Sequence, residues 1–240
     1  MRDTIFTDPT RGERPFVFDA AVSTAFDDMA TRSIPYYAEL QLATCSLCLE
    51  FATPGSTVID VGCSTGTLFQ LIAPRLAARN VKLIGIDSSA DMIARAQEKL
   101  REFMQFISWQ QSEAQDAEFP AAQIIIMNYT LQFVPLQHRP RVLRQIRESL
   151  DPKGALIMSE KISFDCAATQ SRYDSLYYQF KRRNGYSDEE IEAKRRALEG
   201  VLVPQTLENH YNALTEAGFQ LPEIFLQGYQ FVSMLVLPRT

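Results

Sequence analysis

Five short runs of β-branched and apolar residues, separated by segments with helical spacing, constrain the fold of this chain more than any other feature. The runs lie at residues 57–61, 82–86, 106–110, 124–128 and 155–160. Between them apolar residues recur every three or four positions, as Leu143, Ile146 and Leu150 do before the turn that begins at Asp151. Strands that alternate with helices form βαβ units and a parallel sheet. The pattern therefore predicts an α/β chain with a doubly wound sheet.

The last two predicted strands, at residues 223–226 and 231–237, are joined by residues 227–230 alone. A parallel crossover needs a dozen or more residues, so the last strand is expected to run antiparallel. A seven-stranded, mostly parallel sheet with an antiparallel last strand resembles the Rossmann-like class I methyltransferase architecture. It differs from the all-parallel dinucleotide-binding fold.

The remaining segments are predicted to be helical, at residues 19–29, 35–51 and, as several helices, within 163–218. We expect a single domain over residues 1–240. It comprises an N-terminal helical cap (1–55), a core sheet (56–161), a helical insertion with the last helix (162–218) and a C-terminal hairpin (219–240). Ligands of open sheets bind beyond the carboxyl ends of the strands, so the added helices are expected to cover that pocket.

Charge and composition exclude several function classes. The chain has 29 acidic and 24 basic residues, a net charge of −5, whereas binding to a phosphate backbone needs clustered lysines and arginines. Two basic stretches, residues 139–147 and residues 181–183 with 194–196, are typical of solvated helix faces, with a local basic patch as the alternative. No apolar run approaches the roughly 18 residues of a membrane span, and the first twenty residues lack the apolar core of a signal peptide. We expect a soluble cytoplasmic protein with reduced cysteines and neither nucleic acid nor membrane as a direct partner.

The sharpest local motif is the strand and turn at residues 58–66, VIDVGCSTG. Small residues there let a ligand approach backbone amides at the start of a helix. A dinucleotide fingerprint would need glycine at positions 64 and 67, which are Ser64 and Thr67, so a pyrophosphate ligand is not favoured.

Two carboxylates accompany this turn, because Asp60 and Asp87 end successive predicted strands. Such an arrangement suits S-adenosylmethionine (SAM), with Asp87 accepting hydrogen bonds from the ribose and Asp60 and Gly62 framing the methionyl end. The alternative is an ordinary strand-to-helix turn in which Asp87 caps a helix. Further along, Glu113 is the candidate for the adenine amino group, with a merely solvated side chain as its alternative, and Asn128 is placed to contact a ligand.

Metal and covalent chemistry are not expected. Cys45 and Cys48 form a C-x-x-C, but a second such pair is missing from the sequence and its histidines are His138 and His210. A redox pair or half a zinc site is the alternative. Because Leu42, Cys45 and Leu49 recur on one helical face, both thiols are expected to be small core residues.

Longer motifs resemble the carboxy-S-adenosyl-L-methionine synthase family through nearly the whole chain. The matching motifs are RDTIF at 2–6, FD at 18–19, DM at 28–29 with RSIP at 32–35, DVGCS at 60–64, YTLQF at 129–133, GAL at 154–156 with SEK at 159–161, FKR at 180–182 with NGYS at 184–187, and KR at 194–195 with LE at 198–199. The motifs after residue 180 are the most specific, because ordinary methyltransferases vary most there.

This resemblance implies a set of site residues. Tyr37 would cover the cofactor and Arg195, the catalytic residue, would meet the added carboxylate of the product. The rest of the cofactor shell would be Asp60, Gly62, Cys63, Ser64, Asp87, Ser88, Glu113, Ala114 and Asn128. Three positions depart from the family pattern: Tyr36 replaces Gly, Ser88 replaces Asn and Glu113 replaces Asp. Without the resemblance, Arg195 would be an ordinary surface helix residue.

The resemblance also implies a reaction. The family converts SAM and prephenate to carboxy-SAM and phenylpyruvate, and the product serves wobble-uridine (cmo5U) modification of tRNA by a separate enzyme. On one route the departing hydroxide removes the methyl proton, so that no protein base is required. The family is dimeric, and a homodimer is expected with the helical insertion as its interface. Two other hypotheses stay open: a conventional methyltransferase acting on a small molecule or tRNA, and a non-catalytic SAM-binding protein.

Overall fold

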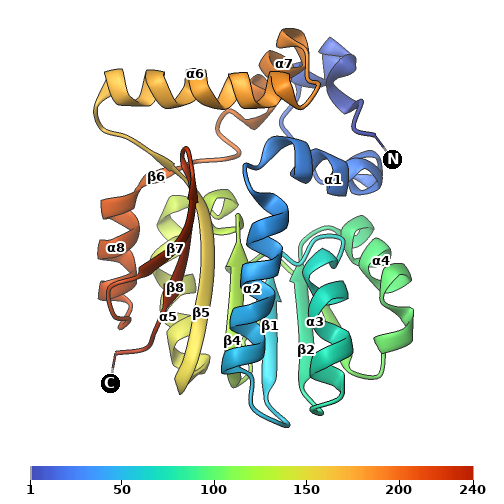
Figure 1. The fold of residues 1–240 in the computed structure, drawn as a ribbon, viewed down its shortest axis with the longest axis vertical. Helices are drawn as coiled ribbons and strands as arrows, with labels where there is room; N and C mark the ends of the chain where they lie inside the picture. The colour runs from blue at the N-terminus through green and yellow to red at the C-terminus, as the bar shows by residue number, and fades with distance from the viewer. Residues whose placement is uncertain (1, 240) are drawn as a thin grey trace.

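One twisted sheet with helices on both faces forms the body of the protein in a computed structural model that describes residues 2–239 (Figure 1). The strand order is β3-β2-β1-β4-β5-β8-β7, with the short β6 paired to β5. The strands are β1 (Thr57–Val61), β2 (Lys82–Asp87), β3 (Ile107–Gln111), β4 (Ala122–Asn128), β5 (Leu150–Ser163), β6 (Gln205–Thr206), β7 (Glu223–Gly228) and β8 (Phe231–Val236). β8 runs antiparallel to both of its neighbours, β5 and β7, and the other strand pairs among residues 2–239 are parallel. The predicted doubly wound, mostly parallel sheet is confirmed, with β8 as its antiparallel last strand.

Two buried cores, one on each face of the sheet, explain the helical layers. On one face α5 (Arg139–Ser149) and α8 (Leu207–Glu216) bury residues such as Val142, Ile146 and Leu214. On the other face α2 (Tyr37–Phe51) and α3 (Thr67–Ala77) bury Phe69 and Ile72. α4 (Ala90–Lys99) packs beside β2 and β3. Burial of both faces is the reason that the central strands are continuous apolar runs.

The C-x-x-C lies in α2. Cys45 and Cys48 are free and buried in the core, as predicted. The prediction that Leu42 shares their buried face is wrong, because its side chain is 60% exposed. Cys45 and Cys48 pack in the core between α2, α3 and the sheet, whereas the Leu42 side chain lies outside this buried face of α2.

The helices outside these layers gather over one end of the sheet and form a cap (Figure 1). The cap contains α1 (Ala20–Ser33), α6 (Ala167–Arg183), α7 (Asp188–Leu198) and the short helices η1 (Ile5–Thr7) and η2 (Pro9–Glu13). α7 packs against η1 and η2, and α1 packs against α6. Segments 1–55 and 162–218, expected as separate additions, therefore contribute to one structural unit.

A buried network holds the two parts of the cap together. The Tyr186 hydroxyl donates to Asp3 Oδ2 at 2.6 Å, and the Arg32 guanidinium lies 4.1 Å from the Tyr186 ring centroid. Arg32 also donates to the Asp3 carbonyl at 2.7 Å and to Asp28 at 2.9 Å. Because Asp3 and Tyr186 are both buried, these contacts fix the segment around Asp3 onto the insertion.

Several predicted boundaries shift. α1 continues to Ser33 instead of ending at residue 29, and stops where Pro35 follows Ile34. β5 begins at Leu150, which pairs with Ala122 across a bulge, so the residues expected to form a turn after α5 belong to the strand. Among residues 2–239, no helix combines the length and apolar character that a membrane crossing requires.

Candidate active site

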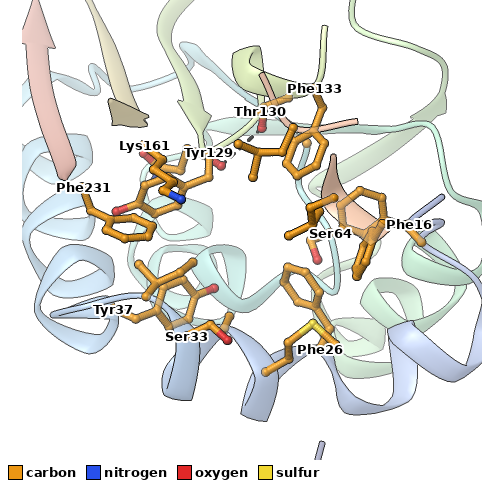
Figure 2. A pocket seen from close by; sticks show the side chains of 18 of the residues that line it. Phe16, Phe26, Ser33, Tyr37, Ser64, Tyr129, Thr130, Phe133, Lys161 and Phe231 are labelled. Atoms are coloured by element: carbon orange, nitrogen blue, oxygen red, sulfur yellow. Dashed lines mark hydrogen bonds between the residues drawn. The ribbon is translucent and has the colours of Figure 1, made fainter. Parts of the chain in front are cut away.

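A cavity of about 470 Å³ lies between the carboxyl ends of the strands and the cap. This size suits a drug-sized or nucleoside-sized ligand. All eleven residues expected to form the site line it: Tyr37, Asp60, Gly62, Cys63, Ser64, Asp87, Ser88, Glu113, Ala114, Asn128 and Arg195. Figure 2 shows Phe16, Phe26 and Phe133 on one side of the space, with Tyr129, Lys161 and Phe231 opposite.

The glycine turn after β1 is held rigidly to the end of β2. The amides of Gly62 and Cys63 both donate to the Ile86 carbonyl, at 2.7 and 3.0 Å. Gly62 has a φ of +76°, and a Cβ built there would lie 2.2 Å from Thr130 Oγ1. Only glycine fits this position. Because the Gly62 and Cys63 amides already donate to Ile86, they are not available to a ligand. A ligand at this turn would contact the other backbone and side-chain groups of the turn.

Asp87 joins the turn to the next helix. Its Oδ2 accepts from the Ser64 amide at 2.8 Å and its Oδ1 from the Ser89 amide at 2.9 Å. Ser89, not Asp87, is the N-cap of α4, so the alternative reading of Asp87 as a helix cap is not supported. Each carboxylate oxygen keeps a free lone pair for a second donor. Burial raises the pKa of Asp87, with the Ser89 and Ser64 amides acting in the opposite direction.

Asp60 is buried in the cavity wall without a cationic partner within 4 Å among residues 2–239. Burial, and secondarily the charge of Asp87, raises its pKa to about 7. Beside it lies Tyr37, and the buried Gln41 Oε1 lacks a hydrogen-bond partner in the described structure. These oxygens are suited to receive a cationic, hydrogen-bond-donating group such as an ammonium. Asp60, Asp87 and Glu113 together are called the acidic wall below.

Asn128 is oriented by the sheet. Its Oδ1 accepts from the Ser159 hydroxyl at 2.7 Å, and Ser159 in turn lies 2.9 Å from the Ser233 hydroxyl. The amide nitrogen of Asn128 is left as the group that can donate to a ligand. Glu113 and Ser88 are exposed at the rim of the cavity, and Ala114 is buried beside them.

Arg195 lines the cavity from α7, but its guanidinium is engaged. Its Nε and Nη2 donate to the two carboxylate oxygens of Glu192, at 2.9 and 2.8 Å, and the Arg195 side chain is half exposed. Glu192 raises the pKa of Arg195, which therefore stays charged. A carboxylate ligand would have to replace Glu192 in this pair.

Tyr36 does not line the cavity, although it departs from the family's glycine. It has a φ of +59°, a conformation that glycine adopts freely and other residues at a cost of about 1–2 kcal/mol. Its ring packs on Gly228, where an added Cβ would lie 2.7 Å from Tyr36 Cδ2. The backbone conformation thus explains the glycine of the family pattern.

Three lysines that the sequence analysis left without a role also line the cavity: Lys161, Lys181 and Lys194, called the lysine cluster below. Lys181 and Lys194 are 5% and 8% exposed, and Arg139 is 3% exposed, so the interpretation of the basic stretches as solvated helix faces is wrong at these positions. Arg139 instead donates to the carbonyls of Val134, Gln132 and Val203. The lysines belong to the SEK, FKR and KR motifs, and their place in these family motifs is the sequence feature that could have indicated a role in the site.

The cysteine and histidine nearest to this chemistry are not poised for covalent catalysis. Cys63 lines the cavity, but burial raises the pKa of its thiol and so disfavours the nucleophilic thiolate. His210 lies in α8, where burial lowers its pKa to about 4. Across residues 2–239, histidine, cysteine, aspartate and glutamate side chains form no group of three or more that could hold a metal ion.

The fold and this cavity define a class. Residues 58–154 match the family model described as a methyltransferase domain. Solved structures of the same fold include a putative O-methyltransferase from Nostoc punctiforme (TM-score 0.65, 15% identity, 97% of this chain and 67% of that one). Another is the N-methyltransferase NodS from Bradyrhizobium japonicum, solved with S-adenosyl-L-homocysteine (TM-score 0.59, 16% identity, 86% and 89% covered). The protein has the class I SAM-dependent methyltransferase fold.

Sequence relatives narrow the class to one family. The carboxy-S-adenosyl-L-methionine synthase of Shewanella amazonensis is 38% identical over 239 residues, covering 99% of this chain and 98% of the relative. Those of Wolinella succinogenes (38% over 236 residues, 98% and 98%) and Haemophilus ducreyi (36% over 241 residues, 100% and 99%) match similarly. The chain belongs to the carboxy-S-adenosyl-L-methionine synthase family.

Proposed function

We propose that this protein converts SAM and prephenate into carboxy-SAM and phenylpyruvate. The observation that carries the proposal is the near-complete coverage of relatives named carboxy-S-adenosyl-L-methionine synthase, because it includes the cap that closes the cavity. It is supported by a cavity that has carboxylates on one side and cationic side chains on another, since SAM is a cation and prephenate a dianion.

SAM occupies the side of the cavity next to the sheet in this proposal. Asp87 accepts hydrogen bonds from the ribose, and Asp60 faces the positively charged methionyl end. Glu113, Ser88, Ala114 and Asn128 surround the nucleoside, while Tyr37 covers it and Gly62, Cys63 and Ser64 form the floor. The unpaired, buried Asp60 supports this orientation, because a cation removes the cost of a buried carboxylate.

The reaction then proceeds without a protein base. The bond between the prephenate ring and its carboxylate breaks, and its electron pair moves into the ring and expels the ring hydroxyl as hydroxide. Hydroxide takes a proton from the SAM methyl group and becomes water. The resulting carbanion attacks the released carbon dioxide, which forms the carbon–carbon bond of carboxy-SAM.

The chain supplies position, charge and a dry environment. Arg195 exchanges Glu192 for the new carboxylate through two parallel hydrogen bonds. Phe16, Phe26 and Phe133 exclude water, which would otherwise compete for the methyl carbanion and dilute the carbon dioxide. Holding both reactants in one cavity supplies proximity.

Wider expectations belong to the same proposal. Residues 1–240 act as one SAM-binding domain, in the cytoplasm and as a homodimer with the helical insertion at its interface. The product passes to a separate enzyme for wobble-uridine modification of tRNA, so this chain makes no contact with RNA. The net charge of −5 supports that division of labour.

Mass spectrometry tests the proposal directly. The purified protein is incubated with SAM and prephenate whose ring carboxylate carries ¹³C, and the nucleoside products are analysed. We expect carboxy-SAM that contains the label, together with phenylpyruvate. S-adenosylhomocysteine formed on addition of a methyl acceptor, with no carboxylated nucleoside, would instead identify a conventional methyltransferase.

A further inference from the structure

The lysine cluster brings together three segments that are distant in sequence. Lys161 comes from β5, Lys181 from α6 and Lys194 from α7. The ammonium groups of Lys161 and Lys181 lie 5.1 and 5.3 Å from the Tyr177 ring centroid. Those of Lys181 and Lys194 lie 5.7 and 5.9 Å from the Tyr186 ring centroid. Two aromatic rings therefore bracket three cations at one part of the cavity wall.

Carboxylates do not neutralise this cluster. Within residues 2–239, none of the three ammonium groups lies within 4 Å of a carboxylate oxygen. The acids whose charges act on these lysines are Asp3, Asp174 and Glu190, and each has another partner. Asp3 accepts from Tyr186, Asp174 accepts from two glutamine side chains at 3.0 and 3.1 Å, and Glu190 accepts from the Ser187 amide at 2.7 Å. Lys194 donates to the Ser33 hydroxyl at 3.2 Å, a neutral partner.

Burial disfavours the charged forms of the three ammonium groups, and their pKa values are lowered accordingly. Burial lowers the pKa of Lys161, and it lowers the pKa of Lys194 to about 8. The pKa of Lys181 lies well below its ordinary value, because of burial and because of the charges of Lys194 and Lys161. Buried like charges without a counter-ion destabilise a fold, so such a cluster is expected where an anionic ligand completes it.

We propose that Lys161, Lys181 and Lys194 form the binding site for a dicarboxylate, the carboxyl donor of the reaction. This inference rests on the proposed function, which supplies the donor's dianionic class. One carboxylate would neutralise one ammonium, whereas the two carboxylates of a dianion can neutralise two of the ammonium groups that lie around Tyr177 and Tyr186. Figure 2 shows Lys161 across the cavity from Ser64, whose amide binds Asp87. The donor thus lies opposite the glycine turn that faces SAM.

Arg195 has a different role in this arrangement. Its guanidinium is half exposed and paired with Glu192. Lys181 and Lys194 are buried and Lys161 is half-buried, and none of the three has a carboxylate partner among residues 2–239. The lysine cluster holds the donor before the reaction, and Arg195 holds the carboxylate after its transfer. Loss of a lysine is therefore expected to act on donor binding, with SAM binding unchanged.

The test uses a matched pair of unreactive probes, benzylmalonate and 3-phenylpropanoate, which differ by one carboxylate. Calorimetry measures the affinity of each for the full-length protein loaded with S-adenosylhomocysteine. The variants are Lys161→Met and Lys181→Met, with Lys82→Met as the control because Lys82 is exposed at the start of β2, the opposite end of the sheet. Thermal melting without probe verifies that the variants are folded.

We expect the parent protein and Lys82→Met to bind benzylmalonate at least about tenfold more tightly than 3-phenylpropanoate, since each charge-assisted hydrogen bond contributes appreciably. Each cluster variant should lose about tenfold or more in benzylmalonate affinity, retain its affinity for S-adenosylhomocysteine, and melt no lower than the parent. Equal affinity for both probes in the parent, or parent-like benzylmalonate binding in the cluster variants, overturns the inference. Variants that melt lower than the parent and still bind benzylmalonate also overturn it, because the lysines then serve the fold.

The outcome is separable from that of the proposed function. Lysine-dependent benzylmalonate binding without any carboxy-SAM formed from prephenate would leave the dicarboxylate site standing and remove prephenate as the donor. Carboxy-SAM formation with an unchanged KM for prephenate in both cluster variants would leave the function standing and remove the lysine cluster from it.

Discussion

The two sides of the cavity differ in charge, in origin and in how they are built. The acidic wall comes from residues in or just after the last positions of β1, β2 and β3, and the backbone amides of Ser64 and Ser89 fix Asp87. The lysine cluster and Arg195 come from the end of β5 and two cap helices, and their contacts are to aromatic rings, hydroxyls and Glu192. In the proposed function the acidic wall binds SAM, and the basic side, which depends on the cap helices, selects the second substrate.

The largest expected effect follows removal of Arg195. Arg195→Ala should reduce kcat/KM for carboxy-SAM formation on the order of 1000-fold, because two charge-assisted hydrogen bonds to the transferred carboxylate are lost. SAM affinity should stay within about twofold, since other residues hold the nucleoside. Arg196→Ala is the control, because Arg196 neighbours Arg195 but does not line the cavity. Equal activity of Arg195→Ala and the parent would contradict the role given to this residue.

A substitution in the acidic wall should have the opposite effect: it should weaken SAM binding and leave dicarboxylate binding unchanged. Asp87→Ala is expected to weaken SAM binding by about 100-fold, because two hydrogen bonds to the ribose disappear together with the fixed turn. Benzylmalonate affinity should change little. Equilibrium dialysis with SAM and with benzylmalonate measures both, and Asp151→Ala, an exposed residue of β5, is the control. A comparable loss for both ligands would show that the two sides are not separate.

A smaller expected effect is the pH dependence of ligand affinity, which should differ between the acidic wall and the lysine cluster. The pKa of Asp60 is raised to about 7, so its carboxylate is charged above that pH and protonated below it. Asp60 faces Asp87 and the neutral Tyr37, and no cationic side chain of residues 2–239 lies within 4 Å of its carboxylate. SAM affinity should therefore fall by up to about tenfold per pH unit as pH decreases below 7. Asp60→Asn should remove most of this dependence.

The dicarboxylate should show the reverse slope. The pKa of Lys194, which faces Asp3 and Arg32, is lowered to about 8, so its ammonium is present below pH 8 and lost above it. Benzylmalonate affinity should thus decrease as pH rises through 8, while SAM affinity does not fall between pH 7 and 8. Calorimetric titrations between pH 6 and 9 would test this, and parallel pH profiles for the two ligands would contradict the prediction.

The sheet and the acidic wall could be predicted because their determinants are local. A strand, a small-residue turn and a carboxylate lie within ten residues of each other, and parallel strands bring their carboxyl ends to one edge. That reasoning supplied Asp60, Gly62, Asp87, Glu113 and Asn128, whereas the other six expected residues came from the family resemblance; all eleven line one cavity.

The lysine cluster could not be predicted in that way. Lys161, Lys181 and Lys194 meet only through the packing of β5, α6 and α7, and a lysine in a charged helix is ordinarily solvated. The prediction that Leu42 is buried was wrong for a related reason. Apolar spacing identifies one face of a helix, whereas contact with α3 determines which residues of that face are buried. The hydrogen bonds from the Gly62 and Cys63 amides to the Ile86 carbonyl likewise depend on the position of the neighbouring strand β2, which local sequence does not specify.

A crystal structure of the protein with S-adenosylhomocysteine and benzylmalonate bound together tests the division of the cavity most directly. The expected result has the ribose at Asp87 and the two carboxylates of benzylmalonate at Lys161, Lys181 and Lys194. A ribose turned away from Asp87, or carboxylates bound anywhere other than the lysine cluster, would contradict it.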